Sequence, residues 1–415
     1  MRIKDLNGFA QGVGRFEEGE HQGMVGFVPH TLPGDVIKPQ AVEFQKRIGL
    51  VKNFALITPS TLRGQAHCQH CGLCPGCSLH SMRTEEYKSL KETVLKNLLR
   101  GPLKEENVPL VCLNQSGFRN KLILHWNQKK NSLAYADDEL LSDILQCPVA
   151  EPAIEEMIRQ IPQAFTGIPG IHKIYLKSLP QNQTVLGIIC KQKPSVSELQ
   201  NQLGNLFENI FWQWDCNPFT IKNYQWVQKQ SEPLFEQVHN HRLHWLPEAF
   251  FQTNRFILHE IVQTLREWIP KQVVVWDLYC GIGTLLFAVR DLVSSGYGIE
   301  FSSIAISCAQ KSAQDLPNLS FECLDLSKDI HKIPKDWKSP EVILLNPPRQ
   351  GISQELMKHI LKMNCPEIIY MSCNPITLER DLTVLIKSGY CLKKTLAFDM
   401  FPNTAHFEIL VQLKK

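Results

Sequence analysis

The strongest constraint on the fold is an alternation of short apolar segments and helical segments that begins near residue 241. Segments of strand length that are separated by helices are typical of a mostly parallel, doubly wound sheet. The sequence therefore predicts an α/β fold for residues 241–415. The expected strands are 273–277, 295–300, 319–325, 342–346, 368–372, 391–399 and 406–413.

The first 240 of the 415 residues have a different character, and a chain of this length holds two or three domains. Residues 1–57 contain β-like segments broken by Gly and Pro, which predict a small OB-like barrel. The basic stretch 46–52 suits an RNA-facing wall, although a barrel used only for packing or assembly fits equally well. Residues 58–240 predict a mixed α+β central domain. Its expected helices are 81–99, 152–165 and 197–208, and its β-like segments are 121–126, 171–177 and 185–191.

Composition narrows the class of protein. The formal net charge is only +3, so any surface for nucleic acid must be local. The N-terminus has no apolar signal-like region, and no run of 18 uncharged apolar residues exists, so we expect neither secretion nor a membrane span. Fourteen cysteines in such a chain indicate a reducing, cytoplasmic compartment, where clustered thiols hold metal or perform chemistry.

Four of these cysteines, Cys68, Cys71, Cys74 and Cys77, lie within ten residues. Zinc sites usually need two Cys-x-x-Cys pairs separated by a dozen residues or more, whereas an iron–sulfur cluster accepts close ligands and one distant cysteine. Cys147 is a candidate for the distant ligand. The spacing therefore favours an iron–sulfur cluster over zinc or incidental thiols, and it leaves open which three of the four bind.

Residues 277–284 form a Gly-x-Gly loop between an apolar strand and a helix. Glycines there let the backbone approach a ligand, and Glu300, at the end of the next strand, is placed to bind ribose hydroxyls. The third glycine of the dinucleotide fingerprint is missing, which argues against NAD. S-adenosylmethionine has no pyrophosphate, so the shorter loop suffices for it. The alternative is a tight strand–helix turn without a ligand.

Two further motifs end predicted strands, Asn346-Pro347-Pro348 and Ser372-Cys373-Asn374-Pro375. Asn-Pro-Pro fits enzymes that methylate exocyclic amines as well as ring carbons. A cysteine nucleophile distinguishes the two, because uracil C5 attacks a methyl donor only after a thiolate has added to C6. Cys373 therefore predicts ring-carbon methylation, and its alternative is an inert core thiol.

This reaction also needs a base to remove the C5 proton. Glu408 interrupts the apolar C-terminal strand, and burial would raise its pKa into a useful range. We therefore predict Glu408 as the base, with His406 as second choice. A solvated strand residue is the alternative for Glu408.

Together these residues resemble the RNA uracil-C5 methyltransferase family (RumA/TrmA-like) over nearly the whole chain. The resemblance rests on four segments and on a fifth that is similar to the family's Gln motif. These segments are 277–283, 346–349, 372–375, 399–408 and 250–254. It implies a Rossmann-like methyltransferase domain, an N-terminal TRAM domain and S-adenosylmethionine as cofactor. The TRAM domain in turn implies the branch that acts on 23S ribosomal RNA.

The resemblance also implies roles for individual residues. Cys373 would be the nucleophile and Glu408 the base. The family's cysteine spacing falls on Cys68, Cys74, Cys77 and Cys147 as ligands of a 4Fe-4S cluster, which leaves Cys71 as an extra thiol. Phe118 to Lys121 is similar to a family segment of the central domain. The implied cofactor-binding residues are Gln252, Tyr279, Thr284, Glu300, Asp325 and Asn346.

One position departs from the family, because Asn346 stands where the family usually has Asp. An amide can still accept from uracil N3–H and donate to O4, so uracil stays the expected base. We therefore expect a monomeric, cytoplasmic enzyme that makes 5-methyluridine in 23S ribosomal RNA. The alternatives are a tRNA uracil-C5 methyltransferase, an exocyclic-amine methyltransferase and a non-catalytic RNA-binding module.

Overall fold

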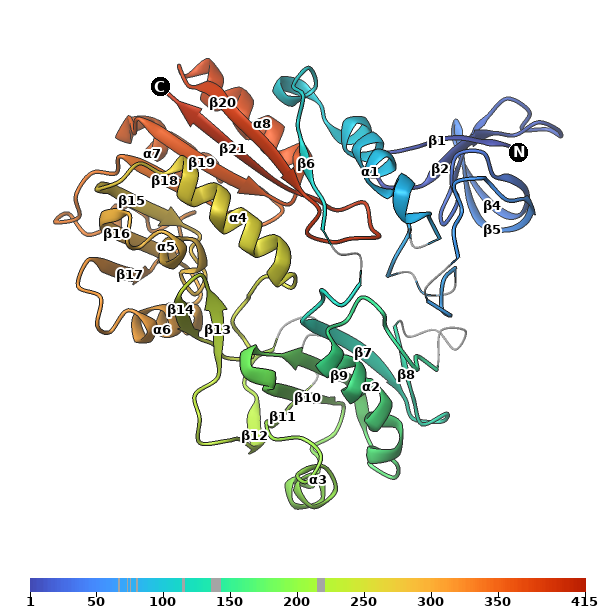
Figure 1. The fold of residues 1–415 in the computed structure, drawn as a ribbon, viewed down its shortest axis with the longest axis horizontal. Helices are drawn as coiled ribbons and strands as arrows, with labels where there is room; N and C mark the ends of the chain where they lie inside the picture. Colours follow the sequence, from blue (N-terminus) through green and yellow to red (C-terminus); the bar gives the residue numbers. More distant parts are fainter. Residues whose placement is uncertain are drawn as a thin grey trace.

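The computed structural model describes residues 1–65, 68–72, 74, 76–79, 81–113, 116–135, 143–214 and 221–415. Three large sheets organise these residues, with five, six and eight strands. In Figure 1 the five-stranded sheet lies to the right, the six-stranded sheet at the bottom and the eight-stranded sheet at the upper left. The predicted α/β fold with a β-rich N-terminal part is confirmed. No helix in the described ranges is both long and apolar enough to cross a membrane.

The N-terminal sheet has the order β1-β2-β3-β5-β4. A bridge between Arg2 and Val36 joins its first strand to the fourth, so the sheet curls into a small barrel. The pattern of residues 1–57 predicts β-like segments at 9–15, 23–29 and 35–38, and a strand is present in each; β1 and β5 were not expected. Lys4 and Asp5 interrupt the apolar pattern of β1, whereas β5 is mostly apolar, with Lys52 as its one charged residue. The strands are β1 (Ile3–Leu6), β2 (Gly12–Arg15), β3 (Val25–Val28), β4 (Val36–Gln45) and β5 (Ile48–Thr58).

The central sheet has the order β12-β11-β10-β9-β7-β8 and packs against the helix α2. Only the pair β10–β11 is parallel among its pairings. The β-like segments expected at 121–126, 171–177 and 185–191 and the helix expected at 152–165 are present, whereas the helix expected at 197–208 ends at Leu203. The strands β8, β11 and β12 were not expected. The elements of this region are β7 (Lys121–Asn127), β8 (Ser132–Ala134), α2 (Pro152–Ala164), β9 (Ile171–Ser178), β10 (Thr184–Cys190), α3 (Val196–Leu203), β11 (Ile210–Trp214) and β12 (Gln225–Gln228), with a 3-10 turn η3 (Pro180–Asn182).

The eight-stranded sheet has the order β17-β16-β15-β18-β19-β21-β20-β6. From β17 to β19 the pairs are parallel, and β21 runs antiparallel between β19 and β20. Val273 and Val275 enter one hydrophobic core, and Val274 and Trp276 enter the other, so both faces are covered. The strands are β15 (Val273–Leu278), β16 (Val293–Glu300), β17 (Leu319–Cys323), β18 (Val342–Leu345), β19 (Glu367–Ser372), β20 (Cys391–Phe398) and β21 (Glu408–Lys414).

Capped helices connect these strands. Asn254, Ser302, Ser353 and Asn374 each accept a backbone N–H bond from the first turn of the helix that follows. Such a cap is worth about 1 kcal/mol. The helices are α4 (Arg255–Trp268), α5 (Thr284–Ala288), α6 (Ser303–Ser312), α7 (Gln354–Met363) and α8 (Pro375–Lys387), with η4 (Ile330–Lys332); a hairpin of β13 (Phe235–Val238) and β14 (His241–His244) precedes α4.

Part of the segment 58–240 packs on the eight-stranded sheet. Strand β6 (Leu110–Val111) pairs in parallel with β20 and forms the edge of the sheet. Helix α1 (Thr84–Leu98), which is followed by η1 (Gly101–Leu103), lies between the barrel and this sheet (Figure 1). Its buried face joins the same hydrophobic core as β18 and β19. The eight-stranded sheet is therefore built from two separate parts of the chain, β6 and the strands from β15 to β21.

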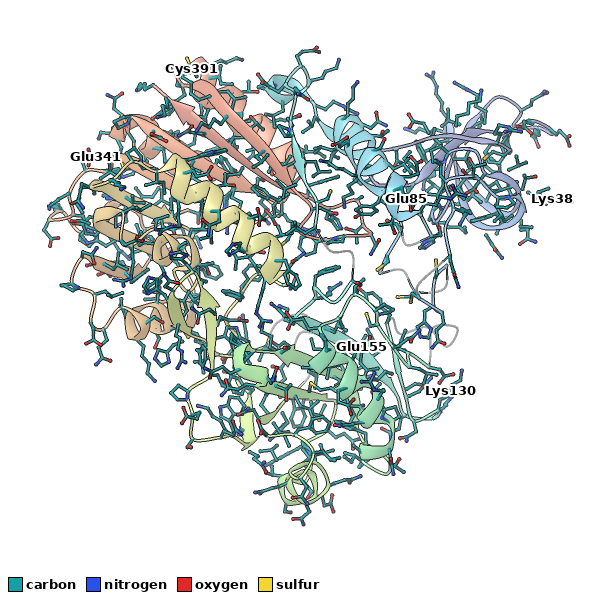
Figure 2. All side chains as sticks on the ribbon, viewed as in Figure 1. Lys38, Glu85, Lys130, Glu155, Glu341 and Cys391 are labelled. Carbon is teal, nitrogen blue, oxygen red and sulfur yellow. The ribbon has the colours of Figure 1, made fainter. Side chains whose placement is uncertain are left out.

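Charged side chains gather at the periphery. Lys38 projects from the barrel and Lys130 from the central sheet, and the exposed Cys391 marks the start of β20 at the outer edge (Figure 2).

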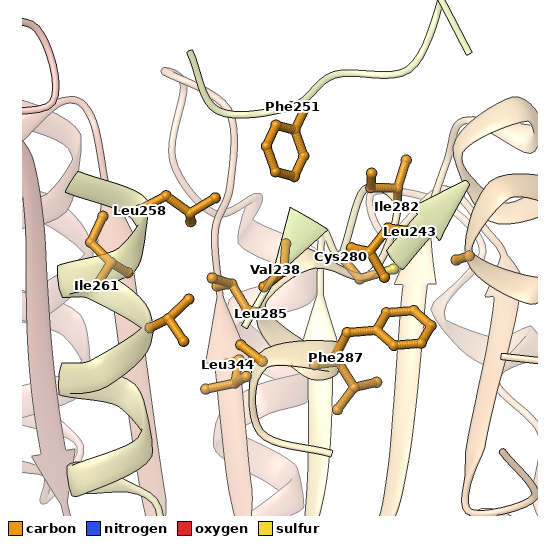
Figure 3. Close-up of a cluster of buried hydrophobic side chains, with 14 of the residues drawn as sticks. Val238, Leu243, Phe251, Leu258, Ile261, Cys280, Ile282, Leu285, Phe287 and Leu344 are labelled. Atoms are coloured by element: carbon orange, nitrogen blue, oxygen red, sulfur yellow. The ribbon is translucent and has the colours of Figure 1, made fainter. Parts of the chain in front are cut away.

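The interior beside α4 is apolar. Figure 3 shows Phe251 above Val238, with Leu258 of α4 on one side and Ile282 on the other. Cys280 and Ile282 belong to this cluster, so it anchors the loop that follows β15.

Candidate active site

The loop between β15 and α5 turns sharply at the carboxyl edge of the sheet. Tyr279, Gly281 and Gly283 have φ angles of 70°, 56° and 85°. A Cβ at Gly283 would lie 2.8 Å from the Phe287 ring, whereas a Cβ at Gly281 would meet nothing within 4 Å. Gly283 is therefore needed for packing, and Gly281 leaves open backbone for a ligand. Thr284 is the first residue of α5.

Glu300 closes this loop from the end of β16. Its carboxylate accepts the backbone N–H groups of Gly281 at 3.2 Å, Phe301 at 3.0 Å and Ser302 at 3.1 Å. Burial raises its pKa, and these hydrogen bonds oppose the effect. The Phe301 side chain beside it is 74% exposed. An acidic group and an exposed ring therefore lie next to the open backbone of Gly281.

Asp325 follows β17 and Asn346 follows β18, the strands that flank β16 and β15 in the sheet. The carboxylate of Asp325 accepts from the Ser327 hydroxyl at 2.6 Å, and this bond, followed by the Ser327 N–H, lowers its pKa. Asn346 comes directly after β18, is half-buried, and donates its N–H to Leu278 O at 3.4 Å. Both positions therefore lie at carboxyl ends of parallel strands, where open α/β sheets bind ligands.

Gln252 lies in the segment before α4 and is 6% exposed. The Asn120 side chain donates to its carbonyl at 3.1 Å, and the Asn120 N–H donates to Thr253 O at 2.9 Å. On the other side, the Asn254 amide donates to Met400 O at 3.2 Å. This segment is therefore held between the central sheet and the loop that leads to β21.

Cys373 occupies a tight turn between β19 and α8. Pro375 is the first residue of α8, where a missing N–H costs nothing, and Asn374 caps the helix by accepting from Ile376 N at 3.2 Å. The proline that ends the strand pattern therefore begins a helix. This turn leaves the thiol half-buried at the carboxyl edge, at the same end of the sheet as Gly281 and Glu300.

The Cys373 thiol has two charged neighbours. Burial raises its pKa, and the carboxylate of Glu408 raises it further. Arg349 opposes both effects through its charge and a hydrogen bond to the thiol. The three residues therefore form one electrostatic group.

Glu408 begins β21 and is 4% exposed. Burial raises its pKa to about 8, and the Arg349 charge opposes the shift. Its Oε2 atom has no hydrogen-bonding partner among the described residues. The expected burial is present, so Glu408 is not a solvated strand residue, because β21 lies in the interior of a sheet covered on both faces. His406, two residues earlier, is exposed.

Arg349 is the residue of this group that sequence reasoning missed. Its carbonyl accepts from the Asn374 amide at 2.8 Å and from the Thr377 hydroxyl at 3.2 Å, so the start of α8 holds the loop after β18. The Asp381 carboxylate accepts from Ile352 N at 2.9 Å and fixes the end of that loop. The only local signal was an arginine directly after Asn-Pro-Pro.

The cysteine-rich segment forms a separate cavity. Cys68, Cys71, Cys74, Cys77 and Cys147 all line it. Burial raises the pKa of each thiol, to about 12 for Cys77 and Cys147. No group of three or more His, Cys, Asp or Glu side chains in the described ranges is arranged around a single metal ion. Thiols are the donor type that iron–sulfur clusters use, and such a cluster is wider than one ion.

A mostly parallel sheet with a Gly-x-Gly loop and an acidic residue at the end of the next strand is the arrangement of Rossmann-like nucleotide-binding domains, the fold class to which Rossmann-like methyltransferases belong. The chain aligns with known proteins of that class. The family described as tRNA (Uracil-5-)-methyltransferase matches residues 231–415. An uncharacterized RNA methyltransferase of Protochlamydia amoebophila is 30% identical over 416 residues, with 95% of this chain and 94% of the relative covered. The chain belongs to the RNA uracil-C5 methyltransferase family.

Two further comparisons extend this result. The 23S rRNA (uracil(1939)-C(5))-methyltransferase RlmD of Photorhabdus laumondii is 27% identical over 423 residues, with 97% of this chain and 93% of the relative covered. The crystal structure of the tRNA (uracil-54, C5)-methyltransferase of Pyrococcus abyssi, in complex with S-adenosyl-L-homocysteine, superposes with a TM-score of 0.79. It shares 22% identity and covers 100% of this chain and 99% of that one, which shows a common fold.

Proposed function

We propose that this chain transfers a methyl group from S-adenosylmethionine to C5 of a uracil in 23S ribosomal RNA. The observation that carries the proposal is the grouping of Cys373, Arg349 and Glu408 at the carboxyl edge of the sheet. The RlmD relatives, which match over nearly the whole chain, favour ribosomal RNA as the substrate. A cytoplasmic location of the protein would follow from that substrate.

The reaction divides into an addition and an elimination. The thiolate of Cys373 forms a bond to C6, which makes C5 nucleophilic, and C5 then takes the methyl group of the sulfonium. Glu408 removes the C5 proton, and the electron pair of that C–H bond re-forms the C5–C6 double bond and expels the thiolate. Arg349 stabilises the thiolate in both steps, because it lowers the pKa of Cys373.

The cofactor would bind along the same edge, where Gly281 leaves open backbone. Glu300 would accept hydrogen bonds from the ribose hydroxyls. Tyr279, Thr284 and Asp325 lie at the same edge of the sheet and would also contact the cofactor. Gln252 and Asn346 would lie between cofactor and uracil. S-adenosylmethionine supplies the electrophilic methyl group when it is bound. The target base would be flipped from its stack to reach Cys373.

The rest of the chain would serve RNA binding. We divide it into residues 1–57 as a TRAM-like barrel, 58–240 as a central domain and 241–415 as the methyltransferase domain, acting together as a monomer. Cys68, Cys74, Cys77 and Cys147 would hold a 4Fe-4S cluster, because they line one cavity and match the family's cysteine spacing; Cys71 lines the cavity as well. The chemistry has no redox step, so the cluster would stabilise structure or position RNA.

The test is methyl transfer from labelled S-adenosylmethionine to transcripts of 23S rRNA and tRNA, followed by mass mapping of the product. We expect 5-methyluridine in the rRNA. Labelled tRNA with unlabelled rRNA would move the proposal to the tRNA branch. A methylated exocyclic amine, or activity that survives Cys373→Ala, would contradict ring-carbon chemistry. No transfer to either RNA by cluster-containing protein would indicate a binding module.

A further inference from the structure

Helix α1 is tied to the loop between β20 and β21 by a buried ion pair. The Lys91 ammonium lies 2.8 Å from Asp399 Oδ1, and both side chains are fully buried. The Tyr87 hydroxyl donates to Asp399 Oδ2 at 2.7 Å and accepts from Asn403 N at 2.7 Å. Tyr87 and Asp399 are 312 positions apart in the sequence. One turn of α1 therefore holds both ends of a short loop.

The loop wraps around the Lys91 ammonium. This group also donates to the carbonyls of Thr404, of His406 at 3.3 Å and of Phe401 at 3.4 Å. It lies 4.5 Å from the centre of the Phe407 ring. A buried ammonium is tolerated only when it is paired and hydrogen-bonded, so these acceptors are arranged for a cation.

The same loop leads directly into Glu408. The carboxylate of Glu408 leaves Oε2 without a hydrogen-bonding partner among the described residues, so backbone placement has to aim it. The loop also accepts from Leu79 N at Asn403 O, at 2.9 Å, and from the Asn254 amide at Met400 O, at 3.2 Å. Its backbone therefore lies between the cysteine segment and the segment that carries Gln252.

We propose that Lys91 is a positioning residue for the proton-abstraction step. It holds the 399–407 loop through Asp399 and three carbonyls, and the loop aims Glu408 at C5 of the base bound to Cys373. This role rests on the function proposed above. Cys373 belongs to a different element, the turn before α8, so Lys91 does not hold it in place for the attack on C6.

This separation gives the test. Lys91→Met keeps length and apolar volume and removes the charge. With full-length enzyme and uridine-containing RNA, we expect turnover to fall by about 10²-fold, as for a misplaced catalytic group. The methylated covalent enzyme–RNA complex should accumulate, seen as a shifted band on a denaturing gel. With 5-fluorouridine RNA, which stops before proton abstraction, the variant should form the adduct at least as fast as the wild type, because a displaced Glu408 no longer raises the pKa of Cys373.

Lys88→Met is the matched control, because Lys88 lies on the exposed face of the same helix. Unchanged turnover of Lys91→Met, or an equal loss of adduct formation and turnover, would overturn the proposal. If Lys91→Met does not fold, Tyr87→Phe carries the test, since it removes only the hydroxyl that binds Asp399 and Asn403. A wild-type enzyme that neither methylates nor traps RNA would instead refute the proposed function.

Discussion

The charge of Glu408 reaches the thiol of Cys373 across two neighbouring strands, and it raises the pKa of that thiol. Ser372, which precedes Cys373, is paired with Ile409, which follows Glu408. The antiparallel register of β19 and β21 thus brings Cys373 and Glu408, the proposed nucleophile and base, together. Arg349 lies beside both and lowers the pKa of each.

Replacing the nucleophile should abolish the reaction. Cys373→Ala removes the bond to C6, so we expect methyl transfer at the level seen without enzyme and no adduct with 5-fluorouridine RNA. The measurement is labelled methyl incorporation together with denaturing gels. Cys391→Ser is the control, because Cys391 is an exposed thiol at the far end of β20. Full activity of Cys373→Ala would exclude the covalent route.

Replacing the base should stop the reaction after methylation. Glu408→Gln cannot accept the C5 proton, so turnover should fall by about 10²–10⁴-fold, and the methylated adduct should persist. The wild-type rate should rise with pH up to about 8, since the carboxyl group must be ionised to act and its pKa is raised to about 8. A Glu408→Gln variant with unaltered turnover would show that another group, such as His406, removes the C5 proton.

The same substitution should change stability in a pH-dependent way. The pKa of Glu408 is about 8 in the folded protein, above the ordinary value of 4.5, so the folded state binds a proton that the unfolded state has lost. Wild-type stability therefore falls as pH rises from about 4.5 to 8, by about 1.4 kcal/mol for each tenfold difference between the two dissociation constants. Glu408→Gln should escape this loss. Urea unfolding at pH 5 and pH 8 measures it, with the exposed Glu355→Gln as control.

Removing the guanidinium should make the thiol harder to ionise. Arg349 lowers the pKa of Cys373, so Arg349→Met should shift the pH profile of 5-fluorouridine adduct formation to higher pH. Arg349→Lys should give a smaller shift than Arg349→Met, because lysine keeps the positive charge and lacks only the planar donor. A profile identical to that of the wild type would show that Arg349 does not act on the thiol.

The family's cysteine spacing predicts a difference between the five thiols that line the cysteine cavity. Cys77→Ala or Cys147→Ala should lose bound iron and sulfide from protein purified without oxygen, because both thiols line the cavity and are expected ligands. Cys71→Ala should retain them. Iron and sulfide content and the visible absorption spectrum measure the outcome. Loss of iron in Cys71→Ala together with retention of iron in Cys68→Ala would show that Cys71, and not Cys68, is a ligand of the cluster.

Much of the catalytic edge could be predicted locally. Apolar runs of strand length identified β15, β18 and β19, because a strand buried on both faces has mostly apolar residues instead of an alternating pattern. The Gly-x-Gly loop and Cys373 follow such strands directly. By contrast, β6 has two residues, which is too short for any periodic pattern.

Local sequence patterns predict the doubly wound domain, because each of its strands and helices is a continuous segment with a recognisable periodicity. The Gly-x-Gly loop and Cys373 also stand out in continuous segments, and their proposed roles stay predictions. The burial of Glu408, the position of Arg349 beside Cys373 and the pairing of Lys91 with Asp399 are visible in the tertiary structure alone. These relationships join residues from different strands and helices. No local pattern specifies which elements meet, since that depends on the packing of the whole chain.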